Sequence, residues 1–152
     1  MLITNHVLSG ALVGAACPGE ASAFALGIAS HFVLDSVPHW GDEAIFLRVA
    51  VVDGLIGLAA MGAITAATSA EHRKRVVAGM LGACAPDADK PSELFFTRSP
   101  YPVALDDWHK RIQRESPRRM PQEVIVAAVG ALLVRHVLRA FPRAFPRTFP
   151  RG

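Results

Sequence analysis

Apolar residues run through this chain in long blocks, which short polar or proline-containing segments separate. No stretch alternates apolar and polar residues in the way that is typical of a half-buried strand. The blocks predict main helices over residues 5–16, 20–36, 42–69, 76–85 and 122–141. We therefore predict an all-α fold, in which a single domain over residues 1–141 forms an apolar bundle of about five helices.

The segments between these blocks carry the polar residues and most of the prolines. Residues 71–75 predict a charged connection, and the proline-rich residues 86–121 predict loops with one short amphipathic helix at 104–115. Thr4 or Asn5 is the expected N-cap of the first helix. The C-terminal residues 142–152 repeat Phe-Pro-Arg, and their regular prolines predict an extended or disordered tail.

The amino-acid composition indicates a membrane protein and differs from that of a typical soluble domain. Apolar residues make up 51% of the chain and charged residues only 19%, and the mean hydropathy is +0.31. A soluble domain usually has about a quarter charged residues. The net charge of +3 comes from basic residues in the connections and the tail, a pattern that indicates membrane helices and no nucleic-acid partner. We expect a multi-pass protein, with residues 49–67 as the best spanning segment.

The stretch from Ser30 to Trp40 places three metal-ligating residue types four positions apart: His31, Asp35 and His39. Steps of four lie on one face of a helix. Pro38 predicts that the helix ends near Asp35 or Ser36, so that His39 follows on a turn and the three side chains can still converge. The alternative is a buried hydrogen-bonded His–Asp pair that closes a helix end.

Other polar residues interrupt apolar segments in the same manner. Asp53 lies inside a predicted apolar helix, where a bare carboxylate costs several kcal/mol unless it is paired or coordinated. Asp87 and Asp89 are expected on a turn directly after an apolar helix, where they can bind an ion or simply form an acidic turn. His6 and His109 complete the predicted ligand set, since His72 and His136 lie among basic residues. The two cysteines predict no disulfide framework.

Nitrogen and oxygen ligands of this kind suit Zn²⁺ ahead of Mn²⁺ or Fe, with enough donors for two ions. The sequence contains no nucleophile elbow and no glycine-rich phosphate loop. Any hydrolytic chemistry would therefore depend on a metal-activated water. The predicted metal ligands are His6, His31, Asp35, His39, Asp53, Asp87 and His109.

The chain resembles the membrane-bound metal-dependent hydrolases of bacterial inner membranes. The resemblance rests on Thr4-Asn5-His6, on the glycine-rich apolar helices, and on the Pro-Asp-x-Asp motif of residues 82–91. The motif of residues 31–39 is also similar to that of zinc-dependent phospholipase C. The double-histidine segment usual after Pro-Asp-x-Asp is missing, and Trp108-His109 stands nearest to it. The resemblance covers roughly residues 1–113 and implies an inner-membrane location.

These observations predict a metal-dependent hydrolase of phosphoesters, whose substrate is a small molecule or a membrane lipid. Asp89 is expected to be a ligand or the general base, and Lys90 or Arg111 to neutralise the phosphate. Two alternatives stay open. A transport or proton-relay protein would line a polar path with Asp53 and the histidines. A structural membrane protein would use its buried polar groups only to fix helix packing.

Overall fold

A computed structural model describes residues 1–140, and this part of the chain is helical. Within it, β-type pairing is limited to one isolated bridge between His39 and Glu115. The all-α prediction is confirmed, but the expected number of about five helices is too low. The α-helices are α1 (Ile3–Ala16), α2 (Glu20–Ser36), α3 (Phe46–Ala67), α4 (Ala70–Cys84), α5 (Asp89–Phe96), α6 (Val103–Ile112) and α7 (Met120–Ala140), with 3-10 turns η1 (Ala85–Ala88) and η2 (Pro117–Arg119). The predicted extended tail, residues 142–152, lies outside the described residues.

Two predicted segments prove to be helical where polar residues or prolines had predicted connections. Residues 71–75 belong to α4 and are not a connection, and Glu71 lies in the first turn, where the helix dipole favours an acid. Helix α5 occupies a stretch that had been predicted as loop. Pro91 is tolerated there because it lies in the first turn of α5, where backbone N–H groups have no partner within the helix.

The start of α1 is capped by a residue from another helix. Thr4 and Asn5 were predicted as N-caps, but the helix already begins at Ile3 and no local side chain caps it. The carboxylate of Asp53 in α3 accepts hydrogen bonds from the Ile3 N–H and the Thr4 hydroxyl, each at 2.5 Å. A negative charge at this end also stabilises the helix dipole. A tertiary contact thus replaces the local cap that the sequence suggested.

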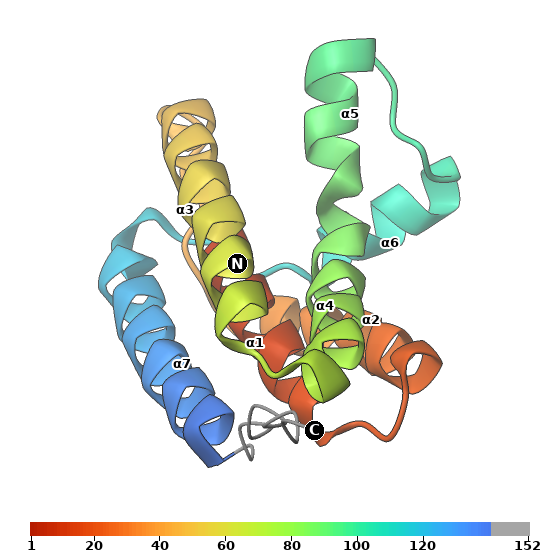
Figure 1. The fold of residues 1–152 in the computed structure, drawn as a ribbon. Helices are drawn as coiled ribbons and strands as arrows, with labels where there is room; N and C mark the ends of the chain where they lie inside the picture. Colours follow the sequence, from red (N-terminus) through yellow and green to blue (C-terminus); the bar gives the residue numbers. More distant parts are fainter. Residues whose placement is uncertain (141–152) are drawn as a thin grey trace, which may run out of the picture.

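Helix α4 packs closely against both α1 and α2, and glycines make this possible (Figure 1). A methyl group added at Gly10 would lie 2.5 Å from the carbonyl oxygen of Gly79, and one added at Gly14 would lie 2.5 Å from that of Arg75. Both distances are shorter than any real contact of this kind. Small residues therefore let the backbones of α1 and α4 approach closely.

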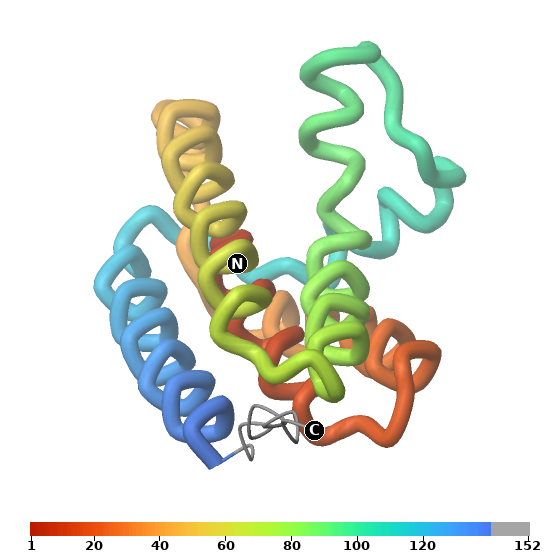
Figure 2. The backbone as a smooth tube through the Cα atoms, in the orientation of Figure 1, coloured from red at the N-terminus to blue at the C-terminus, as the bar shows by residue number. Residues whose placement is uncertain are grey.

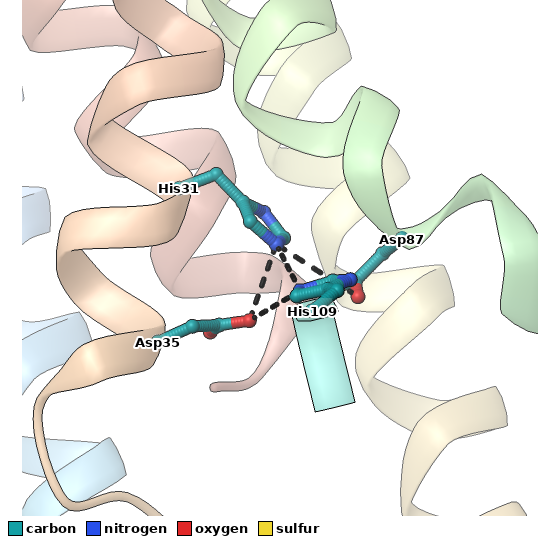
Figure 3. A group of neighbouring side chains, drawn as sticks. All are labelled: His31, Asp35, Asp87 and His109. Carbon is teal, nitrogen blue, oxygen red and sulfur yellow. Dashed lines mark hydrogen bonds and ion pairs between the residues drawn. The ribbon is translucent and has the colours of Figure 1, made fainter. Parts of the chain in front are cut away.

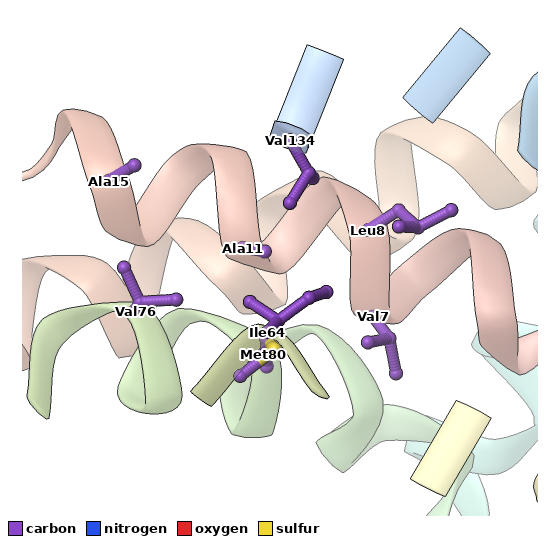
Figure 4. Packing of buried hydrophobic residues seen from close by; sticks show 8 residues of the cluster. All are labelled: Val7, Leu8, Ala11, Ala15, Ile64, Val76, Met80 and Val134. Carbon is purple, nitrogen blue, oxygen red and sulfur yellow. The ribbon is translucent and has the colours of Figure 1, made fainter. Parts of the chain in front are cut away.

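The hydrophobic core lies along α1, with contributions from α3, α4 and α7 (Figure 4). Val7, Ala11, Val76 and Met80 form the α1–α4 part of it and are almost fully buried. Ile64 and Val134 close the cluster from α3 and α7. This packing fixes the first turns of α1 beside the ends of α2 and α4, which is where the polar cluster described below is found.

Two helices extend away from this packed centre. The backbone tube shows α3 and α5 as two arms that diverge (Figure 2). Much of the α3 surface is apolar and exposed, including Leu47, Val51, Leu55 and Leu58. In the described part of the chain, α3 is the helix that is long and apolar enough to cross a membrane.

Candidate metal centre

The His31–Asp35 pair lies at the C-terminal end of α2, as the four-residue spacing predicted. The helix ends at Ser36. The Nε2 atom of His31 lies 3.2 Å from Oδ2 of Asp35, and both side chains are fully buried. Their helix therefore directs both groups into the interior, toward the end of α4.

A second histidine and a second aspartate join this pair from other elements (Figure 3). His109 of α6 places Nε2 3.0 Å from Asp35 Oδ2 and 3.0 Å from His31 Nε2. Asp87 enters from η1, with Oδ1 4.0 Å from His31 Nε2. One ligand atom from each of His31, Asp35, Asp87 and His109 lies within 4.8 Å of all the others, so this group can hold a metal ion.

His6 borders the same group from α1. Its Nε2 atom lies 3.1 Å from Asp35 Oδ1 and 4.0 Å from Asp87 Oδ2. Its ring stacks on that of His31, with 4.0 Å between the ring centroids. Five of the predicted metal ligands therefore lie in one place, and they come from the four elements α1, α2, η1 and α6. We call His6, His31, Asp35, Asp87 and His109 the His/Asp cluster.

Hydrogen bonding determines which ring nitrogen of His31 is available to a ligand. Its Nδ1 atom lies 2.8 Å from the carbonyl oxygen of Ala83, which can only accept, so Nδ1 carries the proton. A neutral ring then presents the lone pair of Nε2 to the cluster. Ligating histidines are commonly oriented by such a bond from the other ring nitrogen. The carbonyl at the end of α4 therefore prepares His31 for metal binding.

The protonation states of the other groups also suit a cation. Burial lowers the pKa of His6. For Asp35, burial alone would raise the pKa, but close contacts with the imidazoles of His109, His31 and His6 outweigh it and hold the pKa well below its usual range. Neutral imidazoles and ionised carboxylates are the forms in which these side chains bind metals.

A buried polar atom without a partner provides an independent test of this fit. Both ring nitrogens of His6 are buried and make no hydrogen bond: Nδ1 has no polar partner, and Nε2 lies 3.1 Å from Asp35 Oδ1 without the geometry of a hydrogen bond. Such groups usually cost free energy, and an unsatisfied one calls for an explanation such as an ion. A cation beside His6 would give its Nε2 atom a partner. The donor set and this unpartnered atom therefore both fit a metal site.

The two carboxylates are placed to be shared between two positions. Asp35 directs Oδ1 to His6 and Oδ2 to His31 and His109. Asp87 likewise has one oxygen 4.0 Å from His6 and the other 4.0 Å from His31. Each acid thus faces His6 with one oxygen and His31 with the other, which is an arrangement compatible with one or two ions.

Two polar groups at the cluster were missed by the sequence analysis. The Gln113 amide donates a hydrogen bond of 3.1 Å to Asp35 Oδ2, and its nitrogen lies 3.3 Å from His109 Nε2. The amino group of Met1 donates one of 2.7 Å to Asp35 Oδ1. Gln113 follows His109 by one helical turn, and this spacing is the signal that could have found it.

The remaining predicted site residues make other contacts. His39 donates from Nδ1 to the Val37 carbonyl, and its buried Nε2 atom lies 3.8 Å from Glu115. Asp53 caps α1, as described above. Asp89 forms an ion pair of 2.7 Å with Lys90. None of these residues belongs to the group of mutually close ligand atoms among residues 1–140.

No protein-family model matches this chain, and no curated protein or solved structure matches it significantly.

Proposed function

We propose that this protein is a membrane-bound, metal-dependent hydrolase of phosphoesters. The observation that supports it most directly is the convergence of three imidazole Nε2 atoms on the carboxylate of Asp35. A structural His–Asp pair would need one imidazole. Three, together with a second carboxylate and ring nitrogens of His6 that make no hydrogen bond, form a donor set suited to zinc or a similar divalent ion.

The cluster residues would hold the metal in two groups. His31 and His109 would bind on one side and His6 on the other, with Asp35 and Asp87 shared. When bound, divalent ions lower the pKa of a coordinated water toward neutrality and stabilise negative charge on phosphoryl oxygens. Gln113 would keep Asp35 and His109 oriented through its amide group.

Lys90 would contribute the positive charge that a phosphate requires. Burial by itself would lower its pKa, but the hydrogen bond to Asp89 and the charges of Asp89 and Asp87 outweigh it and raise the pKa. The amine therefore stays protonated. Asp89, predicted to be a ligand or the general base, is instead assigned to positioning Lys90, since its oxygens bind the Lys90 side chain and backbone.

A membrane location is proposed from the surface of the outer helices. Helix α3 passes the test of length and apolarity for a membrane span. Exposed large apolar residues also line α7, including Val124, Ile125, Leu132 and Leu133. Exposed apolar residues in such number commonly mark a membrane or protein interface. Among residues 1–140, one helix of this kind supports one crossing.

The test is metal content followed by hydrolysis. Purified protein is analysed for bound metals by mass spectrometry, and hydrolysis of bis(p-nitrophenyl) phosphate is measured before and after EDTA treatment. We expect at least one divalent ion per chain and activity that EDTA abolishes and Zn²⁺ restores. His136→Ala is a matched control for His109→Ala, because His136 is an exposed histidine of α7. Folded wild-type protein that binds no divalent ion would contradict the proposal.

A further inference from the structure

A groove of about 640 Å³ opens beside the His/Asp cluster and is lined by residues of α3 and α5. These two helices are the diverging arms of Figures 1 and 2. Its volume lies within the range of known small-molecule sites, roughly 300–1,000 Å³. The part nearest the cluster is polar and includes Asp87, Lys90 and Gln113. Asp87 belongs to the cluster itself, and Gln113 contacts it, so the groove and the cluster are continuous.

The walls of the groove away from the cluster are almost wholly apolar. One wall is the face of α3 that carries Leu47, Val51, Leu55 and Leu58, and the other is formed by Leu94 and Phe95 of α5. The α3 wall runs from Phe46 to Met61, which at 1.5 Å per residue gives a length of about 20 Å. An extended alkyl chain is the ligand that fits such a long apolar trough.

The chemistry of the two ends therefore differs along a single groove. The end at the cluster offers the protonated amine of Lys90 and the site proposed to hold a divalent ion, and both cations would favour an anion. The outer end offers apolar side chains that remain exposed, among them Phe95 at 74% and Leu55 at 65%. Only an amphiphile, with an anionic head and an apolar tail, satisfies both ends at once.

We propose that the substrate is a membrane lipid with a phosphoester head group, and that its hydrocarbon chain lies between α3 and α5 while the phosphate reaches the His/Asp cluster. This inference rests on the proposed hydrolase function and names the substrate class for the same site. The exposed Phe95 and Phe96 near the end of α5 would contact the bilayer from which the lipid enters. Leu55 would contact the hydrocarbon chain of the lipid directly.

Trp40 gives this inference a direct readout, because it lines the groove and is one of two tryptophans in the chain. The other, Trp108, packs edge-on against Phe32 and does not line the groove. In a Trp108→Phe background, metal-depleted protein held in amphipol is titrated with dodecyl phosphate that carries bromine atoms near its head group. We expect saturable quenching of Trp40, with methyl phosphate competing at least ten-fold less well than unbrominated dodecyl phosphate.

Leu55→Arg and Leu132→Arg form a matched pair for this experiment. Both are exposed leucines of long apolar helices, at 65% and 64%, but Leu132 of α7 does not line the groove. We expect Leu55→Arg to weaken quenching at least ten-fold and Leu132→Arg less than two-fold. Equal loss in both variants, or no quenching of Trp40 in the parent protein, would overturn the inference. If Leu55→Arg loses its helical circular dichroism signal and is therefore unfolded, Leu55→Trp replaces it. Binding to Leu55→Trp is then measured by competition between brominated and unbrominated dodecyl phosphate.

Metal content, measured on the same preparations before the metal is removed and again after divalent ion is added back, separates this inference from the proposed function. Protein that binds metal but shows no chain-dependent quenching keeps the hydrolase proposal and refutes the lipid substrate. Protein that shows chain-dependent quenching but binds no metal refutes hydrolysis and, with it, the assignment of the amphiphile as a substrate.

Discussion

Asp35 and Glu123 are both fully buried acids near the start of α1, yet their surroundings differ in kind. Glu123 accepts hydrogen bonds from the backbone N–H groups of Leu2 and Trp40, each at 3.1 Å, and from the Asn5 amide at 2.6 Å. These donors are amides that never ionise. Asp35 is instead surrounded by three imidazoles and an amino group.

This difference separates a structural acid from a ligand. Fixed amide donors satisfy Glu123 completely, so the contacts tie α7 to α1 and to the segment after α2. The Nε2 atoms of His31 and His109 lie 3.0 Å apart, and both face the same carboxylate oxygen of Asp35. Such an arrangement is satisfied best by a cation. Burial alone therefore does not mark a site, whereas the chemistry of the partners does.

The largest expected effect separates these two acids by metal content. Asp35→Asn should lose the bound divalent ion, because the amide oxygen carries no charge and the shared carboxylate disappears. The loss of affinity should exceed the 10–100-fold that typically follows removal of a supporting residue. Glu123→Gln should retain the ion in full. Mass spectrometry of both dialysed variants measures this, and equal metal loss in the two variants would contradict the distinction.

Stability should respond in the opposite order. Glu123→Ala leaves three buried donors without an acceptor, and each such group costs about 1–3 kcal/mol. We expect the free energy of unfolding to fall by about 3–5 kcal/mol. Chemical denaturation followed by circular dichroism tests this. In metal-depleted protein, Asp35→Asn should destabilise less than Glu123→Ala, and the reverse order would argue that Asp35 is the structural acid.

Asp53 provides an intermediate case, since its partners are backbone and hydroxyl donors like those of Glu123. Asp53→Asn removes the charge at the start of α1 and weakens the hydrogen bonds to Ile3 and Thr4. We expect a loss of about 1–2 kcal/mol in unfolding free energy, as for a helix N-cap, with metal content unchanged. Loss of metal in a folded Asp53→Asn variant would instead restore Asp53 to the ligand set that the sequence predicted.

The smallest expected effect concerns Gln113, which supports Asp35 and His109 but supplies no charge. Gln113→Ala should weaken metal affinity by about ten-fold and leave stoichiometry intact at saturating metal. Competition with a chromogenic chelator measures the affinity. Gln122→Ala is a control, because Gln122 bonds to the Pro38 carbonyl and to Arg119 and has no contact with the cluster. An equal change in metal affinity in both variants would contradict the supporting role of Gln113.

Periodicity predicted most of the helices, because apolar blocks of this length leave little choice of structure. The bounds of α2 were predicted as the structure has them, and the His31–Asp35 contact followed from the spacing alone. Helix α5 was missed because Pro91 and Asp89 are usual in loops. Their position in the first helical turn, where both are tolerated, depends on where the preceding helix ends.

The site was only partly predictable, because contacts between distant residues decide it. The predicted ligand set contained all five cluster residues, Asp87 among them, whereas Asp89, predicted as a ligand or the general base, binds Lys90. Asp87 and Asp89 are only two positions apart, yet their side chains make contacts with different groups. Glu123 gave no signal at all, since an acid in the first turn of a helix is ordinarily exposed.

X-ray absorption at the zinc edge of the loaded protein tests the central claim most directly. Ligation by the His/Asp cluster should give a first shell of nitrogen and oxygen near 2.0–2.2 Å, with the outer scattering of imidazole rings. A sulfur shell near 2.3 Å, which would point to Cys17 or Cys84, or a shell of oxygen without imidazole, would contradict the assignment of these histidines as ligands.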